Sequence, residues 1–219
     1  MPVLEALLPK VLSVRRLSGA DPALLRAYGA DPERHRALGL ITVDQDDPAY
    51  VALDEATKHA GVDVVFARSF YAGSRHASGP LSGEFLGVIA SHDPAEVDAG
   101  LDAILATLAH DACFYGANAD SSIAVFPHVI ASLGRYLSAI AGLAPGDPMA
   151  YLVAPPMEAT IALDFALKAA NVRLVKAFPP PTETNFAASW LTGDLPSCEA
   201  AAMAFAAAVC DVAAQPRER

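Results

Sequence analysis

Charged residues and long apolar runs are both scarce in this sequence. Only 18% of the residues are charged, and 25 acidic against 15 basic side chains give a formal net charge of -10. Because nucleic-acid binding needs clustered Lys and Arg, this charge argues against a nucleic-acid partner. No run of about 18 uninterrupted apolar residues occurs, and the N-terminus shows no secretory signal. We therefore expect no membrane partner.

Cysteine is also rare, and the motifs of the common enzyme classes are missing. Cys113, Cys198 and Cys210 are far apart and odd in number, which fits neither a disulfide framework nor a metal site and favours a cytoplasmic location. The six histidines show no close ligand spacing. Signatures of serine hydrolases, P-loop NTPases, zinc proteases and dinucleotide-binding enzymes are absent. These absences favour a protein that is not an enzyme and that holds no metal.

Apolar residues, by contrast, are abundant at 53%, and an internal repeat organises them. An Asp-Pro pair followed by Tyr and then by Glu-Ala-Thr occurs twice, at 47–57 and at 147–160. A second matching pair, at 92–96 and 194–199, opens an Ala-rich segment in each copy. A repeat of roughly 100 residues is a whole small domain, too long for one unit of a solenoid. We therefore predict two tandem domains, residues 1–112 and 113–219.

The apolar pattern in each copy predicts an α+β fold, in which helices pack on one face of a sheet. In the first copy we expect strands at 39–43 and 49–53 joined as a hairpin, followed by a helix at 54–60. Asp93-Pro94 predicts a helix start, because Asp is a favoured N-cap and Pro a favoured first helical residue. In the second copy we expect a helix around 124–140, a strand at 149–154, a helix at 157–170, strands at 172–178 and 186–192, and a helix at 197–213.

Several motifs resemble those of a known family. The segment from Ala150 to Val175, AYLVAPPMEATIALDFALKAANVRLV, resembles the signature of the bacterial microcompartment shell domain. The stretches GLITVDQDDPAY at 39–50, DEATK at 54–58 and PPPTETN at 179–185 are most similar to the tandem-domain shell proteins of ethanolamine-utilisation microcompartments. The resemblance covers nearly the whole chain.

This resemblance implies a fold and an assembly. It implies two circularly permuted, ferredoxin-like shell domains in each chain, and a homotrimer whose six domains form a flat pseudohexameric tile. Such tiles pack with other shell proteins into the shell of a cytoplasmic microcompartment, around the enzymes that degrade ethanolamine. A gated central pore and smaller ethanolamine-binding pores are expected to pass metabolites or cofactors. No cofactor-binding motif is recognisable, but the resemblance associates cobalamin with the central pore, bound or in transit.

The resemblance also assigns residues to the small pore. It implies that Asp46 and Glu84 hold the ammonium group of ethanolamine between two carboxylates, with charge-assisted hydrogen bonds of about 1.5–3 kcal/mol each. The alternative for the acidic stretch around Asp46 is a hairpin turn, in which Asp side chains cap the local backbone. Thr182 and Thr184 lie in a Pro-rich loop that approaches the small pore in the family. Their alternative role is to satisfy the backbone of that loop.

Aromatic residues are candidates for the central pore. The pairs Phe70-Tyr71 and Phe114-Tyr115 adjoin loops of small residues. In the family such loops carry aromatic side chains that close the pore, so we expect these four residues to take part in gating. The alternative is packing in a core or an interface. Lys168 is the lysine of the motif ALKAANV at 166–172, and in the family the lysine of this helix lies at the tile edge. The alternative is that Lys168 lies on a solvated face of the helix.

Two other functions remain open at this point. A tandem small-molecule sensor would also use a repeat and an acidic pocket, and we would expect it to be a soluble dimer whose partner binding is switched by the ligand. A propanediol-type tandem shell protein would share the fold and would differ in the solute that it binds.

Overall fold

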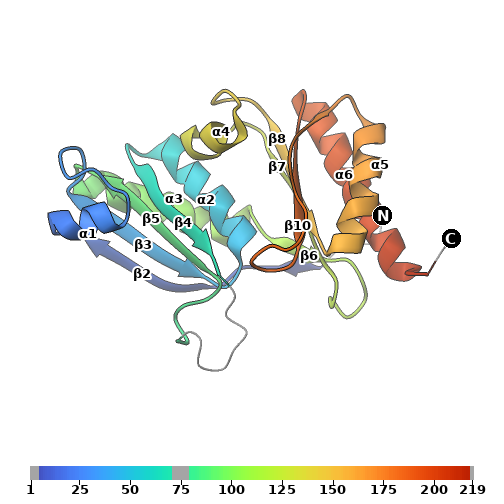
Figure 1. Ribbon diagram of the computed structural model, residues 1–219, viewed down its shortest axis with the longest axis horizontal. Coiled ribbons are helices and arrows are strands. Elements are labelled where there is room, and N and C mark those ends of the chain that lie inside the picture. Colours follow the sequence, from blue (N-terminus) through green and yellow to red (C-terminus); the bar gives the residue numbers. More distant parts are fainter. Residues whose placement is uncertain (1–4, 71–78, 218–219) are drawn as a thin grey trace. The chain divides into compact units, whose positions relative to one another are not determined.

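The computed structural model describes residues 5–70 and 79–217 (Figure 1). Contacts divide the chain into two compact units. The N-terminal unit comprises residues 8–112 with 134–140, and the C-terminal unit comprises the residues up to Leu7 with 113–133 and 141 onward. These units differ from the predicted ranges 1–112 and 113–219 by two short segments. The segment before Leu8 groups with the C-terminal unit, and 134–140 groups with the N-terminal unit.

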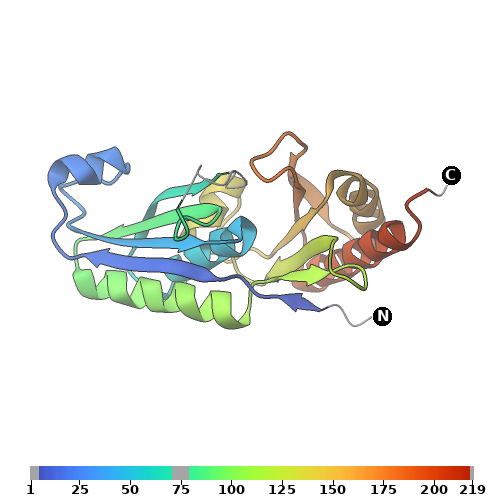
Figure 2. The same cartoon turned by 90° about the horizontal axis from the view of Figure 1, so that it is seen from below.

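The N-terminal unit is built on a four-stranded antiparallel sheet with the order β2-β3-β5-β4. Helices α2 and α3 cover one face, over a buried core that includes Leu53, Phe85 and Ile104. Helix α1 packs on the other face through Leu25, and Figure 2 shows α1 and α3 on opposite sides of the sheet. The elements are β2 (Val11–Leu17), α1 (Pro22–Ala27), β3 (Ala37–Val43), α2 (Asp46–His59), β4 (Asp63–Ser69), β5 (Phe85–Ser91), α3 (Pro94–His110) and α4 (Arg135–Ala141).

The C-terminal unit is built on a six-stranded antiparallel sheet with the order β1-β6-β7-β8-β10-β9. Helices α5 and α6 pack together on one face (Figure 1). Alanine dominates their contact with the sheet, since Ala162, Ala166 and Ala201 are fully buried. The elements are β1 (Ala6–Leu7), β6 (Phe114–Gly116), β7 (Ala124–Ile130), β8 (Met149–Ala154), α5 (Pro156–Ala169), β9 (Arg173–Phe178), β10 (Ala187–Thr192) and α6 (Leu195–Ala214).

The two units repeat one topology. Strands β7-β8-β10-β9 have the same chain order and the same sheet order as β2-β3-β5-β4, with one long helix after the second strand and another after the fourth. This confirms the prediction of two tandem α+β domains. In each unit one strand, β2 or β7, precedes the strand–helix–strand–strand–helix part of the series and pairs with the strand that follows it in the chain. Strand β2 is at the edge of its sheet, whereas β7 also pairs with β6.

The register of the repeat differs from the prediction. Asp47-Pro48 lies in the first turn of α2, whereas Asp147-Pro148 precedes β8. Helices α2 and α5 both have 14 residues, and their ninth residues are Asp54 and Asp164. An Asp-Pro pair can start a helix or a turn, so the similarity of these short motifs did not identify equivalent positions.

Two predicted elements are wrong. Residues 49–53 belong to α2 and form no strand, because Asp46 and Asp47 occupy the first turn, where carboxylates complement the helix dipole. Residues 124–130 form strand β7, which pairs with β8 and is rich in β-branched and aromatic residues. The helix predicted there is confined to α4, which starts at Arg135.

The Asp93-Pro94 signal predicted the start of α3 correctly, and α6 starts two residues before the predicted 197. Asp93 caps α3 by accepting a hydrogen bond from the Ala95 N–H (2.8 Å), and Asp194 caps α6 through the Ser197 N–H (2.8 Å). Among the described residues, α6 is the one helix whose length and apolar composition would suit a membrane span. Cys198 and Phe205 of α6 are buried in the core of the C-terminal unit, as in a core helix. The absence of a membrane partner stays a prediction.

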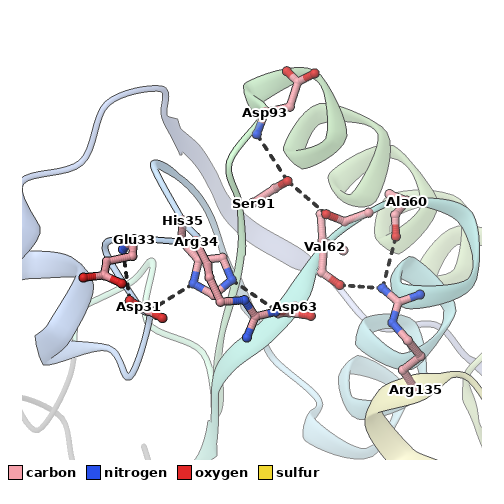
Figure 3. A network of polar contacts seen from close by, with 11 residues as sticks. Asp31, Glu33, Arg34, His35, Ala60, Val62, Asp63, Ser91, Asp93 and Arg135 are labelled. Atoms are coloured by element: carbon pink, nitrogen blue, oxygen red, sulfur yellow. Dashed lines mark hydrogen bonds and ion pairs between the residues drawn. The ribbon is translucent and has the colours of Figure 1, made fainter.

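A buried histidine fixes the connection between α1 and β3, as Figure 3 shows. His35 is 6% exposed, and its Nδ1 accepts a hydrogen bond from the Asp31 N–H (3.0 Å). The neutral ring therefore carries its hydrogen on Nε2, which donates to Asp63 Oδ2 (3.1 Å). Arg34 donates to the same oxygen (2.9 Å). This network ties the segment after α1 to the first residue of β4.

Candidate functional site

An acidic cluster lies at one end of the N-terminal sheet. Asp44 follows β3, Asp46 is the first residue of α2, and Glu84 immediately precedes β5. Strands β3 and β5 pair antiparallel with Val43 opposite Phe85, and the Glu84 N–H donates to the Val43 carbonyl (2.9 Å). Strand pairing therefore brings residues about 40 positions apart in the sequence to the same end of the sheet.

The electrostatics of this cluster favour a cation. Burial raises the pKa of the Glu84 carboxyl, and the negative charges of Asp46 and then of Asp44 raise that pKa further. Asp44 Oδ1 accepts a hydrogen bond from the Lys10 N–H (2.6 Å), and Asp46 Oδ1 accepts one from the Asp47 N–H (3.0 Å). Carboxylates that repel one another in this way bind a positive group more strongly than an isolated carboxylate would.

The raised pKa of Glu84 makes a prediction about stability. A carboxyl whose pKa is higher in the folded state than in the unfolded state binds its proton more tightly when folded, so its ionised form destabilises the fold at neutral pH. Glu84→Gln should therefore raise the melting temperature at neutral pH, by about 1 °C because the half-exposed charge is screened by solvent. The gain should shrink as the pH falls through the raised pKa, where the wild-type glutamate becomes neutral.

Differential scanning calorimetry of both proteins across the acid range measures this difference. Asp102→Asn, at an exposed position of α3, is the matched control and should leave the melting temperature unchanged at every pH. A melting temperature of Glu84→Gln at or below that of the wild type at neutral pH would contradict the prediction.

The predicted threonines belong to the C-terminal unit. Thr182 and Thr184 lie in the loop between β9 and β10, and both are half-buried. The Thr182 hydroxyl donates to the Phe186 carbonyl (2.7 Å), and the Asn185 N–H donates to the Thr182 carbonyl (3.2 Å). Thr182 therefore satisfies the backbone of its own loop, which was the alternative to binding a ligand. The lone pairs of its hydroxyl oxygen can still accept a hydrogen bond. A ligand contact by either threonine stays a prediction.

The aromatic candidates occupy different environments. Phe70 is half-buried after β4, and its N–H donates to the Glu84 carbonyl (3.0 Å), while Tyr71 lies outside the described residues. Phe114 is 9% exposed, and its ring lies 5.0 Å from that of Phe126, centre to centre. Phe114 is therefore packed against other side chains, which was the alternative to a role in gating.

The remaining candidates are Tyr115 and Lys168. Burial raises the pKa of the Tyr115 hydroxyl, which lies beside Cys113. Lys168 has a 74% exposed side chain, and its Nζ pairs with Asp164 one helical turn earlier (2.5 Å). Lys168 therefore lies on a solvated face of α5 in the single chain. Gating by these aromatic residues and a tile-edge role for Lys168 stay predictions.

The side chains that the structure describes form no metal site. Within residues 5–70 and 79–217, no group of three or more His, Cys, Asp or Glu side chains is arranged to hold a metal ion. The loop that the resemblance associates with the central pore includes 71–78, which lie outside the described residues. Cobalamin at the central pore therefore stays a prediction.

Comparison with known proteins agrees with the topology. The family model for the BMC domain matches residues 37–119. The match begins at β3, so it leaves out β2, the edge strand that precedes β3 in the chain. That is the order expected when the edge strand of a shell domain has been moved to its N-terminal end by circular permutation.

Full-length relatives are more informative than the family model. The chain is 48% identical, over 100% of both chains, to the bacterial microcompartment shell protein EutL of Salmonella typhimurium. The crystal structure of the ethanolamine utilization protein EutL from Leptotrichia buccalis superimposes with a TM-score of 0.94 over 99% of both chains, at 47% identity. A trimeric bacterial microcompartment shell protein, PduB, gives a TM-score of 0.75 over 94% of this chain and 89% of its own. At 19% identity that likeness concerns the fold alone.

Proposed function

Because this chain belongs to the EutL family of bacterial microcompartment shell proteins, and therefore has a structural role in a shell, we propose that it is a trimeric tile that binds ethanolamine. Three copies, each with two shell domains, would place six similar units around a three-fold axis. Such tiles would meet other shell proteins edge to edge, in a microcompartment in the cytoplasm. The repeated topology of the two units supports this arrangement, since equivalent units can take equivalent places in a ring.

The acidic cluster is the observation that carries the ligand proposal. Protonated ethanolamine has one ammonium group and one hydroxyl group. The ammonium would lie between the carboxylates of Asp46 and Glu84, with the negative charge of Asp44 beside them. An ammonium group has three N–H donors, enough for both carboxylates and one further acceptor. The hydroxyls of Thr182 and Thr184 are the candidates for that further polar contact.

Titration calorimetry with ethanolamine tests this proposal. Asp46→Asn and Glu84→Gln each remove one charged acceptor, and each should weaken binding by about 10- to 140-fold, the effect of losing about 1.5–3 kcal/mol. Affinity should also fall in acid, and the fall should begin at a higher pH than an ordinary glutamate would give, because the pKa of Glu84 is raised. Asp102→Asn is the control and should bind as the wild type does.

Unchanged affinity for ethanolamine in both variants would contradict the assignment of these two carboxylates to the binding site. An affinity that fell equally in Asp102→Asn would show a general effect of net charge, and it would also count against a specific site. A titration with 1,2-propanediol, which has no cation, should give no heat above the heat of dilution. Binding of that diol as tightly as ethanolamine would favour a propanediol-type shell protein.

The central pore would act as a two-state gate. Phe70, Tyr71, Phe114 and Tyr115 are proposed to contribute to its closed state, and metabolites or cobalamin would pass in its open state. A ligand shifts such an equilibrium only when it binds one state better than the other. Ethanolamine in the small pore would therefore close the central pore only by binding the closed state more tightly.

A further inference from the structure

A cavity of about 360 Å³ lies at one end of the C-terminal sheet, where β8 and β9 begin and β10 ends. Every residue that lines it belongs to the C-terminal unit. Four of these residues have polar side chains: Asp147, Asn171, Arg173 and Thr192. Cavities of roughly 300–1,000 Å³ with a few polar groups are typical of sites for small molecules. The cavity is therefore large enough for a ligand of its own.

In the N-terminal unit a histidine occupies the matching place. His35 lies two residues before β3, and Asp63 is the first residue of β4. The buried ring of His35 donates from Nε2 to Asp63 Oδ2 (3.1 Å), as Figure 3 shows. Strands β3 and β4 lie on either side of β5, so this hydrogen bond joins the starts of two strands across the end of a third.

The C-terminal unit has an acid and a base at the two equivalent positions, with their order exchanged. Asp147 lies two residues before β8, as His35 does before β3. Arg173 is the first residue of β9, as Asp63 is of β4. Within residues 5–70 and 79–217, no hydrogen bond or ion pair joins the side chains of Asp147 and Arg173, although both line the cavity. The cavity therefore separates a carboxylate from a guanidinium.

We infer that this cavity binds a small zwitterion, a molecule with a carboxylate at one end and an ammonium group at the other. The guanidinium of Arg173 would hold the carboxylate through two parallel N–H donors. The ammonium would donate to Asp147, whose Oδ2 accepts the Ala144 N–H (2.9 Å) and whose carboxylate has lone pairs for further hydrogen bonds. The Asn171 amide and the Thr192 hydroxyl line the same space and would add polar contacts. The ligand would thus make the link that a histidine makes in the N-terminal unit.

This ligand class differs from ethanolamine, and the cavity is separate from the acidic cluster, which belongs to the N-terminal unit. Ethanolamine has a cation but no anion, so it would satisfy Asp147 and leave Arg173 without a partner. A simple carboxylate would do the reverse. A ligand held at both ends by charge-assisted hydrogen bonds should bind at least about 10-fold more tightly than a ligand held at one end.

Titration calorimetry with three ω-amino acids, glycine, β-alanine and 4-aminobutyrate, tests this inference. Their lengths differ, so the one that binds best also measures the gap between the two charges. We expect the wild type to bind that amino acid at least about 10-fold more tightly than the carboxylic acid or the amine of the same length. Arg173→Gln and Asp147→Asn should each remove this preference. The controls Arg26→Gln on α1 and Asp102→Asn on α3 change exposed charges outside the cavity and should keep it.

The outcomes separate a zwitterion site from simpler ones. A wild type that binds none of the three amino acids would overturn the inference, and so would affinity that neither cavity variant changes. Affinity that falls in Arg173→Gln alone would show a site for anions and would also overturn it. If Asp147→Asn does not fold, the wild type decides, because the amino acid and the carboxylic acid of the same length differ only in the ammonium group. Equal affinity for those two compounds would then contradict the inference.

Discussion

Replacing Gly134 by alanine should lower the stability of the N-terminal unit by about 2–4 kcal/mol, from overpacking and from strained or lost buried hydrogen bonds. A Cβ on Gly134 would collide with the Asp54 carbonyl oxygen, and it would lie 2.6 Å from Thr57 Oγ1 and 2.8 Å from Asp54 Oδ1. These are atoms of a buried helix, so they cannot move aside without disturbing α2. The collision also falls on the carboxylate that receives the Gly134 N–H.

The segment around Gly134 caps α2, and this cap explains why the effect should be large. Burial raises the pKa of Asp54, and the N–H groups of Leu137 and Gly134 oppose that rise by stabilising its charged form. Arg135 donates to the carbonyl oxygen of Thr57 in the last turn of α2. It also donates to the carbonyl oxygen of Val62 (2.8 Å), just before β4 (Figure 3). A cation at a helix C-terminus stabilises carbonyls that have no partner within the helix. Displacing Gly134 would weaken all of these bonds together.

Urea unfolding measures this effect. Gly19→Ala is the control, because a Cβ at Gly19 meets nothing within 4 Å and its backbone is not left-handed. The midpoint for Gly134→Ala should fall well below that of the wild type, while Gly19→Ala should unfold close to it. Equal midpoints for the two variants would show that α2 does not depend on its cap.

Replacing Gly83 by alanine should also destabilise the protein, by about 2–4 kcal/mol, and should weaken ethanolamine binding at the same time. Gly83 has φ +62°, a left-handed conformation that an L-residue adopts at a cost of about 1–2 kcal/mol. Its Cβ would also collide with the Val43 carbonyl oxygen, and it would lie 2.8 Å from Leu12 Cδ1. That carbonyl accepts the N–H of Glu84, so the collision would displace a residue of the acidic cluster.

Gly142→Ala separates the two causes. Gly142 has φ +66°, and a Cβ there would meet no atom within 4 Å, so it shares the backbone strain without the collision. We expect Gly142→Ala to lose only the strain energy and to bind ethanolamine normally by calorimetry. Gly83→Ala should lose more stability than Gly142→Ala and should bind more weakly. Equal losses in the two variants, with unchanged binding, would contradict a role for Gly83 in holding Glu84.

The sequence by itself determined the features that depend on nearby residues. Asp93 predicted the start of α3, because an N-cap acts on N–H groups two or three positions ahead, and Asp194 acts in the same way at α6. The residues from 150 to 175 predicted the family, and the full-length comparisons confirm it. The repeat predicted two domains of one fold, since a duplicated domain keeps its order of elements.

Only the tertiary structure decided the features that depend on distant pairing. The pairing of β3 with β5 brings Asp44 and Asp46 to Glu84. The family resemblance had joined Asp46 to Glu84, but no local pattern in the sequence specifies that alignment or adds Asp44 to it. The helical state of residues 49–53 depends on burial against the sheet, which overrides a short strand-like pattern. The place of segment 134–140 on α2 rests on bonds to residues about 80 positions earlier. The spacing of residues in the sequence does not predict such contacts, because their partners come together only when the chain folds.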